Sequence, residues 1–443
     1  MEAYVHRPDA VLTGLPRVAD PQAVRELLAE HFTDGVEIER VTLHDFAYRP
    51  ERAARFVYEL ELRDTTGARH THFMHGWLGS TAQIGRRYAR FAQHRWHTPR
   101  FGPAFLHFPE LGFLVWGFPN DSKLRLESLA DAARALVTLR GVSGTSHATA
   151  QRCTSRIVHY VPRKRIVMHH VLDPGEHHVY TKSYGNARGA QVFSMTQELW
   201  ERSRTDAEAF RIARPLAYLA ESRTLVQEAL VGWHAIDENA WPLETPRMDR
   251  LGRCLARLHT SDVSVHSEWS HDRELALFEK VADAVRRFDA ALCVELDEVC
   301  RLARRTAPHG DAGRHVPVHG AFRFKQMLAA GDQVALVDLD GLRRGDPVAD
   351  LGSLVAQLQA RVASGRLAAD AADAAVAALL ATYRREVPWS VSEPTLAWYV
   401  ALRLVSKHAI GPVNHLKRDA GARIRALLEA SGRILNARRA VVS

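Results

Sequence analysis

The chain has 443 residues, of which 46% are hydrophobic and 25% are charged, so it is long enough for two or three domains and is not intrinsically disordered. The formal net charge is +8, yet the basic residues are dispersed and no aromatic and basic motif of a nucleic-acid-binding module occurs, so we expect no nucleic-acid partner. The four cysteines include no Cys-x-x-Cys pair, and the sequence has no apolar run of roughly 18 residues and no signal-peptide pattern at the N-terminus. These features predict a cytoplasmic protein that does not enter a membrane.

The N-terminal half contains one pattern of elements twice. Tyr48-Arg49-Pro50 and Tyr160-Val161-Pro162 each lie at the end of a predicted strand, and a turn of charged residues and a second strand follow. Each pair continues with a third strand, a helix at about 80–92 or 191–203, and a further strand near 112–118 or 223–230. The repeat predicts two related β-rich domains, at residues 1–150 and 151–232.

The third strands of the two copies differ at one informative position. Aligning Phe73 with Tyr180 places His75 opposite Lys182, so only the second copy has a lysine there. We therefore expect the first copy to be a degenerate domain with a structural or regulatory role.

Residues 233–443 are predicted to be mostly helical. The segment 248–259 places apolar residues at 251, 254, 255 and 258, which form one face of a helix. Segments rich in alanine and arginine predict further helices at about 273–305, 351–361, 368–385, 396–406 and 420–437. Together with the two β-rich segments, this pattern indicates a mixed α+β protein.

One stretch of the helical region has the spacing of a catalytic motif. His319-Gly320-Ala321 is followed by Gln326, by an apolar strand at 334–337 and by Asp338-Leu339-Asp340. The order resembles the aminoglycoside phosphotransferase and choline kinase superfamily, whose loop reads His-Gly-Asp, four variable residues and Asn, then an apolar strand and Asp-x-Asp. Ala321 stands at the position of the catalytic aspartate of that superfamily.

Two neighbouring segments bear on this resemblance. Gly345-Asp346-Pro347 and Asp350 match the Gly-Asp-Pro-x-x-Asp pattern of the superfamily, and we expect Asp350 to brace the loop. His309-Gly310-Asp311 is a literal His-Gly-Asp, but Val316 occupies the position where the motif needs an amide. We therefore interpret this second sequence as an exposed turn.

The resemblance implies a protein-kinase-like fold of two lobes. The small lobe is an antiparallel sheet with a helix, the large lobe at 233–443 is mostly helical, and the first β-rich domain precedes them as a second small-lobe-like domain. The resemblance also implies that the protein binds Mg·ATP and transfers the γ-phosphate to a hydroxyl group of a small molecule.

The resemblance also assigns roles on the nucleotide side. Lys182 holds the α and β phosphates and pairs with a helix carboxylate, for which we favour Glu198 over Glu201. Glu228 lies in a segment similar to the hinge of the superfamily, which is implied to bind the nucleotide.

In the loop region, Gln326, Asp338 and Asp340 are the implied Mg²⁺ ligands. His319, Arg323 and Lys325 are the candidate catalytic residues of the loop.

Ala321 leaves three alternatives open. The first is a phosphotransferase in which the substrate or another side chain removes the hydroxyl proton. A general base contributes about 10²- to 10⁴-fold to a rate, so the absence of the aspartate slows such an enzyme without abolishing nucleotide binding. The second is a pseudokinase that acts as a nucleotide-responsive scaffold or binds a protein partner. The third is a nucleotidyl or other transferase. Arg323, Lys325, Arg343 and Arg344 favour an anionic small-molecule acceptor over a polycationic one.

Overall fold

The computed structural model describes residues 9–32, 35–142, 149–204, 210–240, 243–308 and 315–442. These residues form two compact units. Unit 1 comprises Met1–Phe193, Pro215–Ala229 and Asn414–Arg418, and unit 2 comprises Ser194–Arg214, Leu230–Val413 and Asp419–Ser443. The predicted turn at His309-Gly310-Asp311 lies outside the described residues.

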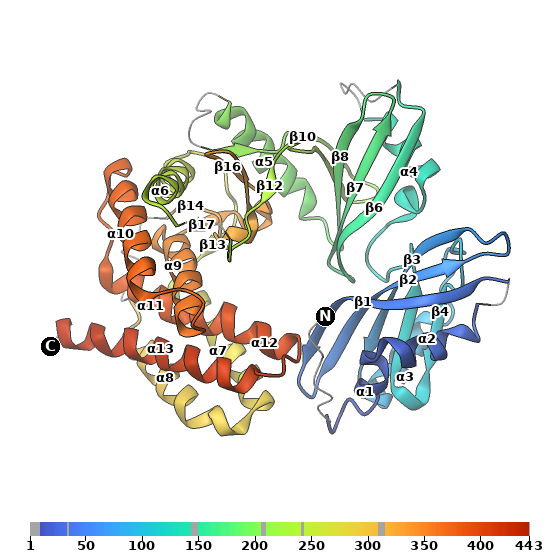
Figure 1. Ribbon diagram of the computed structural model, residues 1–443, viewed down its shortest axis with the longest axis horizontal. Helices are drawn as coiled ribbons and strands as arrows, with labels where there is room; N and C mark the ends of the chain where they lie inside the picture. The colour runs from blue at the N-terminus through green and yellow to red at the C-terminus, as the bar shows by residue number, and fades with distance from the viewer. Residues whose placement is uncertain are drawn as a thin grey trace. The chain divides into compact units, whose positions relative to one another are not determined.

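Unit 1 contains two antiparallel sheets of the same topology (Figure 1). The N-terminal sheet has the order β1-β2-β3-β5-β4 and the second sheet the order β6-β7-β8-β11-β10, so the strand order is repeated element by element. The strands of the N-terminal sheet are β1 (Glu37–Arg49), β2 (Ala53–Arg63), β3 (Arg69–Leu78), β4 (Phe105–Phe108) and β5 (Phe113–Gly117). Those of the second sheet are β6 (Arg152–Val161), β7 (Arg165–Asp173), β8 (His177–Tyr184), β10 (Pro215–Leu219) and β11 (Thr224–Glu228).

Helices accompany both sheets. Between the third and fourth strands of each copy lies a helix close to its predicted position, and Ser80 caps the first of these helices by accepting a hydrogen bond from the Gln83 N–H. The helices are α1 (Leu15–Ala19), α2 (Pro21–Ala29), α3 (Thr81–Phe91) and α4 (Ala132–Arg140), with short 3₁₀ turns η1 (Pro109–Leu111) and η2 (Glu127–Leu129). Helix α5 (Gly189–Ser203) follows the third strand of the second sheet, and its residues from Ser194 on belong to unit 2. One buried core joins the two sheets, because Val57 of β2 packs in the same cluster as Tyr160 and Ile166 of the second sheet.

A buried carboxylate holds the first hairpin of each sheet in the same way. Asp9 accepts hydrogen bonds from the Tyr48 hydroxyl at 2.7 Å and from the N–H of Glu51 at 2.8 Å. Asp121 accepts them from the Tyr160 hydroxyl at 3.0 Å and from the N–H of Arg163 at 2.8 Å. The sequence separations are 39 and 42 residues in both copies, so the repeat extends to the segment before each hairpin.

The strand register corrects one detail of the predicted repeat. Ala54 pairs with Leu78 in the N-terminal sheet, as Ile166 pairs with Ser183 in the second sheet. Trp77 therefore lies at the position of Lys182, and the placement of His75 opposite Lys182 is wrong by two residues. The β2–β3 hairpin is longer than the β7–β8 hairpin, with strands of 11 and 10 residues against 9 and 8, which sequence alignment alone did not reveal.

Unit 2 is mostly helical, as predicted. The predicted segment 273–305 is two helices rather than one, because Asp289 adopts an extended conformation and caps a new turn through the N–H of Ala291. The helices are α6 (Thr245–His259), α7 (His271–Phe288), η4 (Ala290–Leu292), α8 (Cys293–Arg305), α9 (Val348–Ala363), α10 (Ala369–Glu386), α11 (Glu393–Arg403), a π-helical turn η7 (Leu404–Ala409), α12 (Ile410–Asn414) and α13 (Ala420–Val442).

Two small sheets lie among these helices. The first has the order β12-β15-β16-β9 and the second β13-β17-β14. Their strands are β9 (Arg211–Ile212), β12 (His234–Ala235), β13 (Glu268–Trp269), β14 (Val316–Val318), β15 (Met327–Ala330), β16 (Gln333–Leu336) and β17 (Arg343–Gly345), joined by the 3₁₀ turns η5 (Phe324–Gln326) and η6 (Leu339–Gly341). The segment with the catalytic spacing thus runs from β14 through the β15–β16 hairpin to β17.

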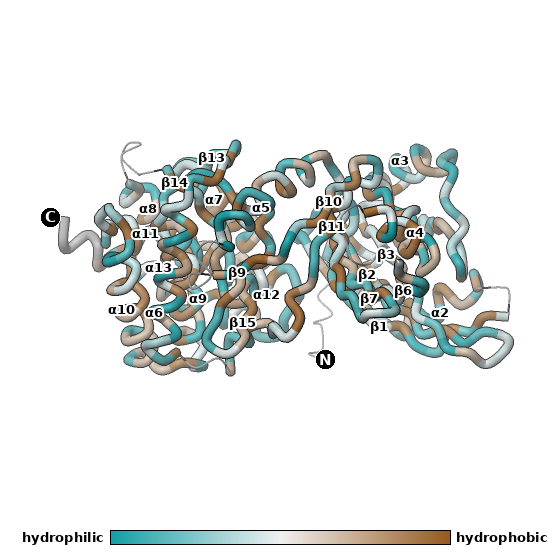
Figure 2. Tube along the Cα trace, turned by 90° about the horizontal axis from the view of Figure 1, so that it is seen from above, coloured by the Kyte–Doolittle hydropathy of each residue, from teal (hydrophilic) through white to brown (hydrophobic). Residues whose placement is uncertain are grey.

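Figure 2 shows hydrophobic and hydrophilic residues interleaved along the tube in both units. None of the helices in the described ranges is both long and apolar enough to cross a lipid bilayer. The mixed α+β fold with antiparallel sheets confirms the predicted fold class.

Candidate functional site

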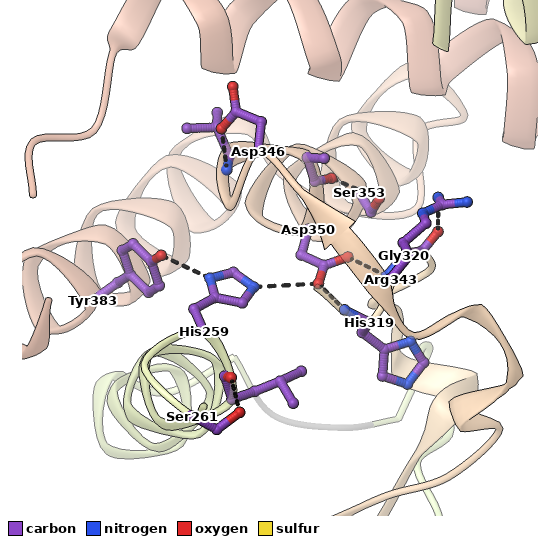
Figure 3. A network of polar contacts seen from close by, with 12 residues as sticks. His259, Ser261, His319, Gly320, Arg343, Asp346, Asp350, Ser353 and Tyr383 are labelled. Carbon is purple, nitrogen blue, oxygen red and sulfur yellow. Dashed lines mark hydrogen bonds and ion pairs between the residues drawn. The ribbon is translucent and has the colours of Figure 1, made fainter. Parts of the chain in front are cut away.

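The loop after β14 is held by one buried carboxylate (Figure 3). Asp350, in the first turn of α9, accepts hydrogen bonds from the N–H of His319 at 2.6 Å and of Gly320 at 2.9 Å. A buried N–H without a partner costs about 1–3 kcal/mol, so Asp350 fixes the backbone of this loop. Its position agrees with the bracing role expected from the sequence.

Two further side chains hold Asp350 itself. His259, at the end of α6, places Nε2 3.3 Å from Asp350 Oδ2 and Nδ1 2.7 Å from the Tyr383 hydroxyl. Asp350 is fully buried, and burial alone raises the pKa of a carboxyl. The hydrogen bond and charge of His259 and the His319 N–H outweigh burial, so the pKa of Asp350 lies below its ordinary value of 3.8.

Gly320 meets a close backbone approach at the turn of the loop. Its φ of +77° lies in the left-handed region, and a Cβ at this position would lie 2.7 Å from the Gly341 carbonyl oxygen. The Gly320 carbonyl accepts a hydrogen bond from Arg343 Nη2 at 3.1 Å. The loop is therefore fixed on both sides, by Asp350 at its N–H groups and by Arg343 at its carbonyl.

His319 connects the loop to the strand that delivers Asp338. Its ring is buried, and Nε2 lies 3.1 Å from the Val337 carbonyl oxygen, one residue before Asp338. Asp338 adopts φ +60° and ψ +49°, a left-handed conformation that costs on the order of 1 kcal/mol in a residue other than glycine. His319 thus positions the backbone beside Asp338, and its role in the structure is bracing.

Gln326 closes the loop that begins at Ala321. With its amide oriented so that both ends find a partner, Nε2 donates to the Ala321 carbonyl and Oε1 accepts from Arg323 Nη2 at 3.3 Å. The Gln326 oxygen therefore faces a guanidinium rather than a vacant ligand position. Gln326 thus braces the loop, and its role as a metal ligand stays a prediction.

Arg323 lies among charges of both signs. Burial lowers the pKa of Arg323, and the positive charge of Arg403 lowers it further, while Asp338 and Glu238 act in the opposite direction. Asp338 is therefore close enough to Arg323 to interact with it electrostatically. Lys325, two residues on, is exposed.

A second brace holds the 3₁₀ turn of the loop. The N–H of Phe324 donates to Gln357 Oε1 at 3.1 Å, and Gln357 Nε2 donates to Glu238. Gln357 is buried in α9, two helical turns after Asp350 and on the same face of the helix. Helix α9 therefore holds the loop at two places.

Asp338 and Asp340 remain as candidate Mg²⁺ ligands. Both are carboxylates, the donors that Mg²⁺ prefers, and Mg²⁺ in phosphotransferases is commonly held by one or two carboxylates together with substrate phosphates. No group of three or more His, Cys, Asp or Glu side chains with metal-binding geometry occurs among the described residues. Asp338 and Asp340 have the donor type that such a metal takes from a protein.

The nucleotide-side residues lie in two different units. Lys182, half-buried on β8, and the exposed Glu228, at the end of β11, belong to unit 1. Glu198 belongs to unit 2, where it accepts from the N–H of Ser264 at 3.0 Å and from Arg202 Nη2 at 3.2 Å. Glu201, the alternative, lies 3.4 Å from Arg204.

The turn between β6 and β7 packs against the N-terminal sheet. The Arg163 guanidinium lies 4.3 Å from the centre of the Trp77 ring, and Arg87 lies 3.6 Å from it. Arg55 Nη1 donates to the Pro162 carbonyl at 3.3 Å. Arg163 is thus engaged by Trp77 of the first copy.

Sequence reasoning missed several residues around the loop. Glu238, Gln357, Glu274, Arg403 and Lys407 contact the loop residues or act on their charges, yet none lies in the recognised motif. Their sequence separations are long, as in the 129 residues between Glu274 and Arg403, so a single sequence contains no signal that links them.

The structure has the elements of a kinase-like fold. These are an antiparallel sheet with a helix after its third strand, a helical second unit, and a braced loop followed by a hairpin that ends at Asp338. Residues 201–385 match the model of the phosphotransferase enzyme family. The match covers the braced loop, the hairpin and α9, and it confirms the resemblance over that part of the chain.

One solved structure agrees with this fold, and two further structures match the chain with lower TM-scores. A candidate aminoglycoside phosphotransferase of Ralstonia eutropha JMP134 superposes with a TM-score of 0.52 at 17% identity, over 71% of this chain and 99% of its own. Spectinomycin phosphotransferase has a TM-score of 0.47 at 11% identity, over 70% and 98% of the two chains. The choline kinase LicA of Streptococcus pneumoniae has a TM-score of 0.44 at 14% identity, over 63% and 93%. No curated protein matches the sequence.

Proposed function

We propose that the protein binds Mg·ATP and transfers the γ-phosphate to a hydroxyl group of a small molecule. The observation that carries this proposal is the loop itself. Asp350 fixes the N–H groups of His319 and Gly320, and His319 in turn fixes the backbone beside Asp338. Phosphoryl transfer depends mainly on positioning and on neutralising charge, and a loop braced in this way supplies the positioning.

Each candidate residue has one proposed role on the nucleotide side. Lys182 contacts the α and β phosphates, with Glu198 as its orienting carboxylate, and Glu228 lies in the hinge segment that contacts the base. Asp338 and Asp340 hold the Mg²⁺, which neutralises charge on the phosphates when it is bound.

The reaction exchanges one phosphorus–oxygen bond for another. The acceptor oxygen forms a bond to the γ-phosphorus, the bond from that phosphorus to the β–γ bridging oxygen breaks, and ADP leaves. The proton of the acceptor hydroxyl passes to a phosphoryl oxygen or to water. Because the transition state of phosphoryl transfer is loose, proton removal is late, and the loss of the aspartate at Ala321 slows the step without removing the grip on the phosphates.

Ala321 favours a second candidate function. Without the aspartate, the expected loss is about 10²- to 10⁴-fold in rate, roughly 3 to 5 kcal/mol in the barrier. A protein that still binds the nucleotide but transfers phosphate this slowly would act as a pseudokinase, a nucleotide-responsive scaffold with a protein partner.

The four cysteines are free thiols, which supports the cytoplasmic location that we propose in either case.

Calorimetry and turnover together test the proposal. Purified protein should bind ATP only with Mg²⁺, and Asp338→Ala should abolish that binding. ADP release above the rate of the Asp338→Ala variant, in the presence of pooled small-molecule alcohols, supports the phosphotransferase, and binding without release supports the pseudokinase. If ATP does not bind, both functions are excluded.

A further inference from the structure

A group of basic side chains in unit 2 lies next to the loop, and the function proposed so far gives none of them a contact with a ligand. Arg403 ends α11, and Lys407 lies in the π-helical turn that follows it. Arg323 and Arg343 come from the loop and from β17. Interruptions of this π type in α-helices occur often at functional sites, which directs attention to Arg403 and Lys407.

Arg403 is the most buried of the four and is only partly paired. Its side chain is 0% exposed, and its Nη2 donates to Glu274 Oε2 at 2.8 Å. The same Glu274 oxygen accepts from Trp269 Nε1 at 2.8 Å. Within the described ranges, Arg403 Nε and Nη1 have no hydrogen-bond partner. Two guanidinium donors therefore remain for another acceptor.

Arg343 joins this pair to the catalytic loop. Its guanidinium carbon lies 3.9 Å from the centre of the Trp269 ring, while Nη2 donates to the Gly320 carbonyl at 3.1 Å. Its Nε is buried and has no partner in the described part of the chain. A continuous set of contacts thus leads from Gly320, next to Ala321, through Arg343 and Trp269 to Glu274 and Arg403.

The charges of these groups act on one another. Burial lowers the pKa of Arg343, and the positive charge of Arg403 lowers it further, as for Arg323. Burial and the charge of Arg403 lower the pKa of Lys407 to about 8, with Arg323 and Arg343 adding to this effect and Glu274 opposing it. The other three cations are therefore within electrostatic range of Arg403.

The carboxylates nearby leave several donors of these cations without an acceptor among the described residues. Glu274 is the carboxylate that pairs directly with Arg403, and Asp350 already accepts from the N–H groups of His319 and Gly320. Burial and the charges of Asp346 and Glu274 raise the pKa of Tyr399, while Arg403 and Arg343 act in the opposite direction, so Tyr399 remains a neutral donor. Asp338 and Glu238 act on Arg323, and Asp350 and Glu274 act on Arg343. Within the described ranges, however, Arg403 Nε, Arg403 Nη1 and Arg343 Nε donate to no carboxylate. A buried donor without an acceptor is costly, and an anionic ligand offsets that cost.

We propose that Arg323, Arg343, Arg403 and Lys407 bind the anionic group, a carboxylate or a phosphate, of the acceptor molecule. This inference rests on the phosphotransferase function proposed above. The planar guanidinium group of an arginine can donate two parallel hydrogen bonds to the oxygens of a carboxylate or of a phosphate. The acceptor is then a small hydroxy acid or a phosphorylated alcohol, with its hydroxyl group toward Ala321. A polycationic antibiotic does not fit this site, since it requires carboxylates.

Three probes of one carbon skeleton test the charge requirement on the full chain without nucleotide. Glycerol 3-phosphate and glycerate, each at matched ionic strength, should raise the melting temperature, and neutral glycerol at the same concentration should not. The probe that acts at lower concentration identifies the anion as phosphate or carboxylate, and either result supports the site. If neither anion raises the melting temperature more than chloride does, the proposal is wrong.

Lys407→Met locates the effect. The substitution removes a partly buried cation, so the variant should fold and should be at least as stable as the wild type, while its affinity for the active probe falls by about tenfold. Lys280→Met, which removes the same charge from an exposed position on α7, is the matched control and should bind as the wild type does. Arg403→Lys, which keeps the charge and loses the fork, should also weaken binding. Equal affinity in Lys407→Met, Arg403→Lys and wild type would overturn the assignment.

Measuring probe binding with and without ATP tests the anion site separately from the phosphotransferase function. Saturating Mg·ATP should leave the affinity for the probe within about threefold, because the nucleotide and the acceptor occupy different sites. Competition between ATP and the probe would assign the cations to the nucleotide phosphates and overturn the inference. Binding of the probe without any binding of ATP would leave the anion site intact and refute the phosphotransferase. Binding of ATP with no effect of either anion would refute the anion site and leave nucleotide binding intact.

Discussion

The Tyr160 hydroxyl donates a hydrogen bond to the buried carboxylate of Asp121 at 3.0 Å, in the second sheet of unit 1. Tyr48 and Asp9 form the same bond in the N-terminal sheet, at the same sequence separation. Because each carboxylate also accepts from the N–H at the hairpin turn, one residue fixes a strand and its turn together. The two sheets therefore share a structural device as well as a strand order.

Tyr160→Phe and Tyr48→Phe should each lower the free energy of unfolding by about 1–2 kcal/mol, because each leaves a buried carboxylate with one donor fewer. Urea denaturation of the full chain measures the effect. Tyr88→Phe, at a partly exposed hydroxyl in α3, is the control and should change stability by less than about 0.5 kcal/mol. Losses no larger than that of Tyr88→Phe would show that the shared bond contributes nothing to stability.

Asp350→Asn should destabilise the protein by about 3 kcal/mol, because it removes the charge that satisfies His259 and two loop N–H groups. The pKa of Asp350 is below 3.8 in the fold, so its stabilising contribution is present above pH 3.8 and is lost as the pH falls through the lower folded value. The difference in unfolding free energy between wild type and Asp350→Asn should therefore shrink in acid.

Asp373→Asn, at an exposed position of α10, is the matched control for that experiment and should leave the unfolding free energy nearly unchanged. A difference between wild type and Asp350→Asn that stays constant down to pH 2.5 would contradict the lowered pKa.

ATP should raise the melting temperature only together with Mg²⁺, and Lys182→Ala or Asp338→Ala should remove that rise. A ligand at 100 times its dissociation constant adds about 2.7 kcal/mol of stability, which thermal melting detects readily. Lys280→Ala controls for the loss of one positive charge. A wild-type melting temperature that does not respond to millimolar Mg·ATP would refute nucleotide binding.

Ala321→Asp should increase ATP turnover at least about tenfold, equivalent to a fall of about 1.4 kcal/mol in the barrier. The reason is that Asp350, Arg343 and Gln326 already hold the loop backbone, so the new carboxylate starts from a fixed Cβ. Initial rates of ADP release with a defined acceptor measure the effect. A wild type that turns over ATP and is slowed by the substitution would instead indicate that alanine makes room for the acceptor.

Lys407→Met should stabilise the protein below pH 8 by about 1–3 kcal/mol, since one pKa unit corresponds to about 1.4 kcal/mol. In the wild type, the pKa of Lys407 falls from 10.5 to about 8, through burial and the charges of Arg403, Arg323 and Arg343 against that of Glu274. Between these values the unfolded chain binds more protons than the folded one, so wild-type stability should rise with pH relative to the variant.

Denaturation of both proteins from pH 7 to 10 checks the Lys407 prediction. The difference in unfolding free energy should narrow as the pH rises through about 8. If Lys407→Met is less stable than the wild type at every pH, Lys407 forms a stabilising pair in the folded protein.

The sequence by itself determined the class of the fold. Apolar periodicity located most helices of unit 2, and the Tyr-x-Pro hairpins located both sheets, because each of these signals lies within a few neighbouring residues. The spacing from His319 to Asp338 was recognisable for the same reason, since one loop and one hairpin connect them. The position of Ala321 in that loop also follows from the sequence alone.

The tertiary structure decided the surroundings of the loop. The pairs Asp350 with His259, Gln357 with Glu238 and Arg403 with Glu274 are separated by 91, 119 and 129 residues, and no local pattern links such positions. The register that places Trp77 at the position of Lys182 depended on hairpin length, and the orientation of Gln326 depended on Arg323. Local spacing determines which elements form, whereas packing between distant segments determines which charges meet, and the proposed anion site follows from that packing.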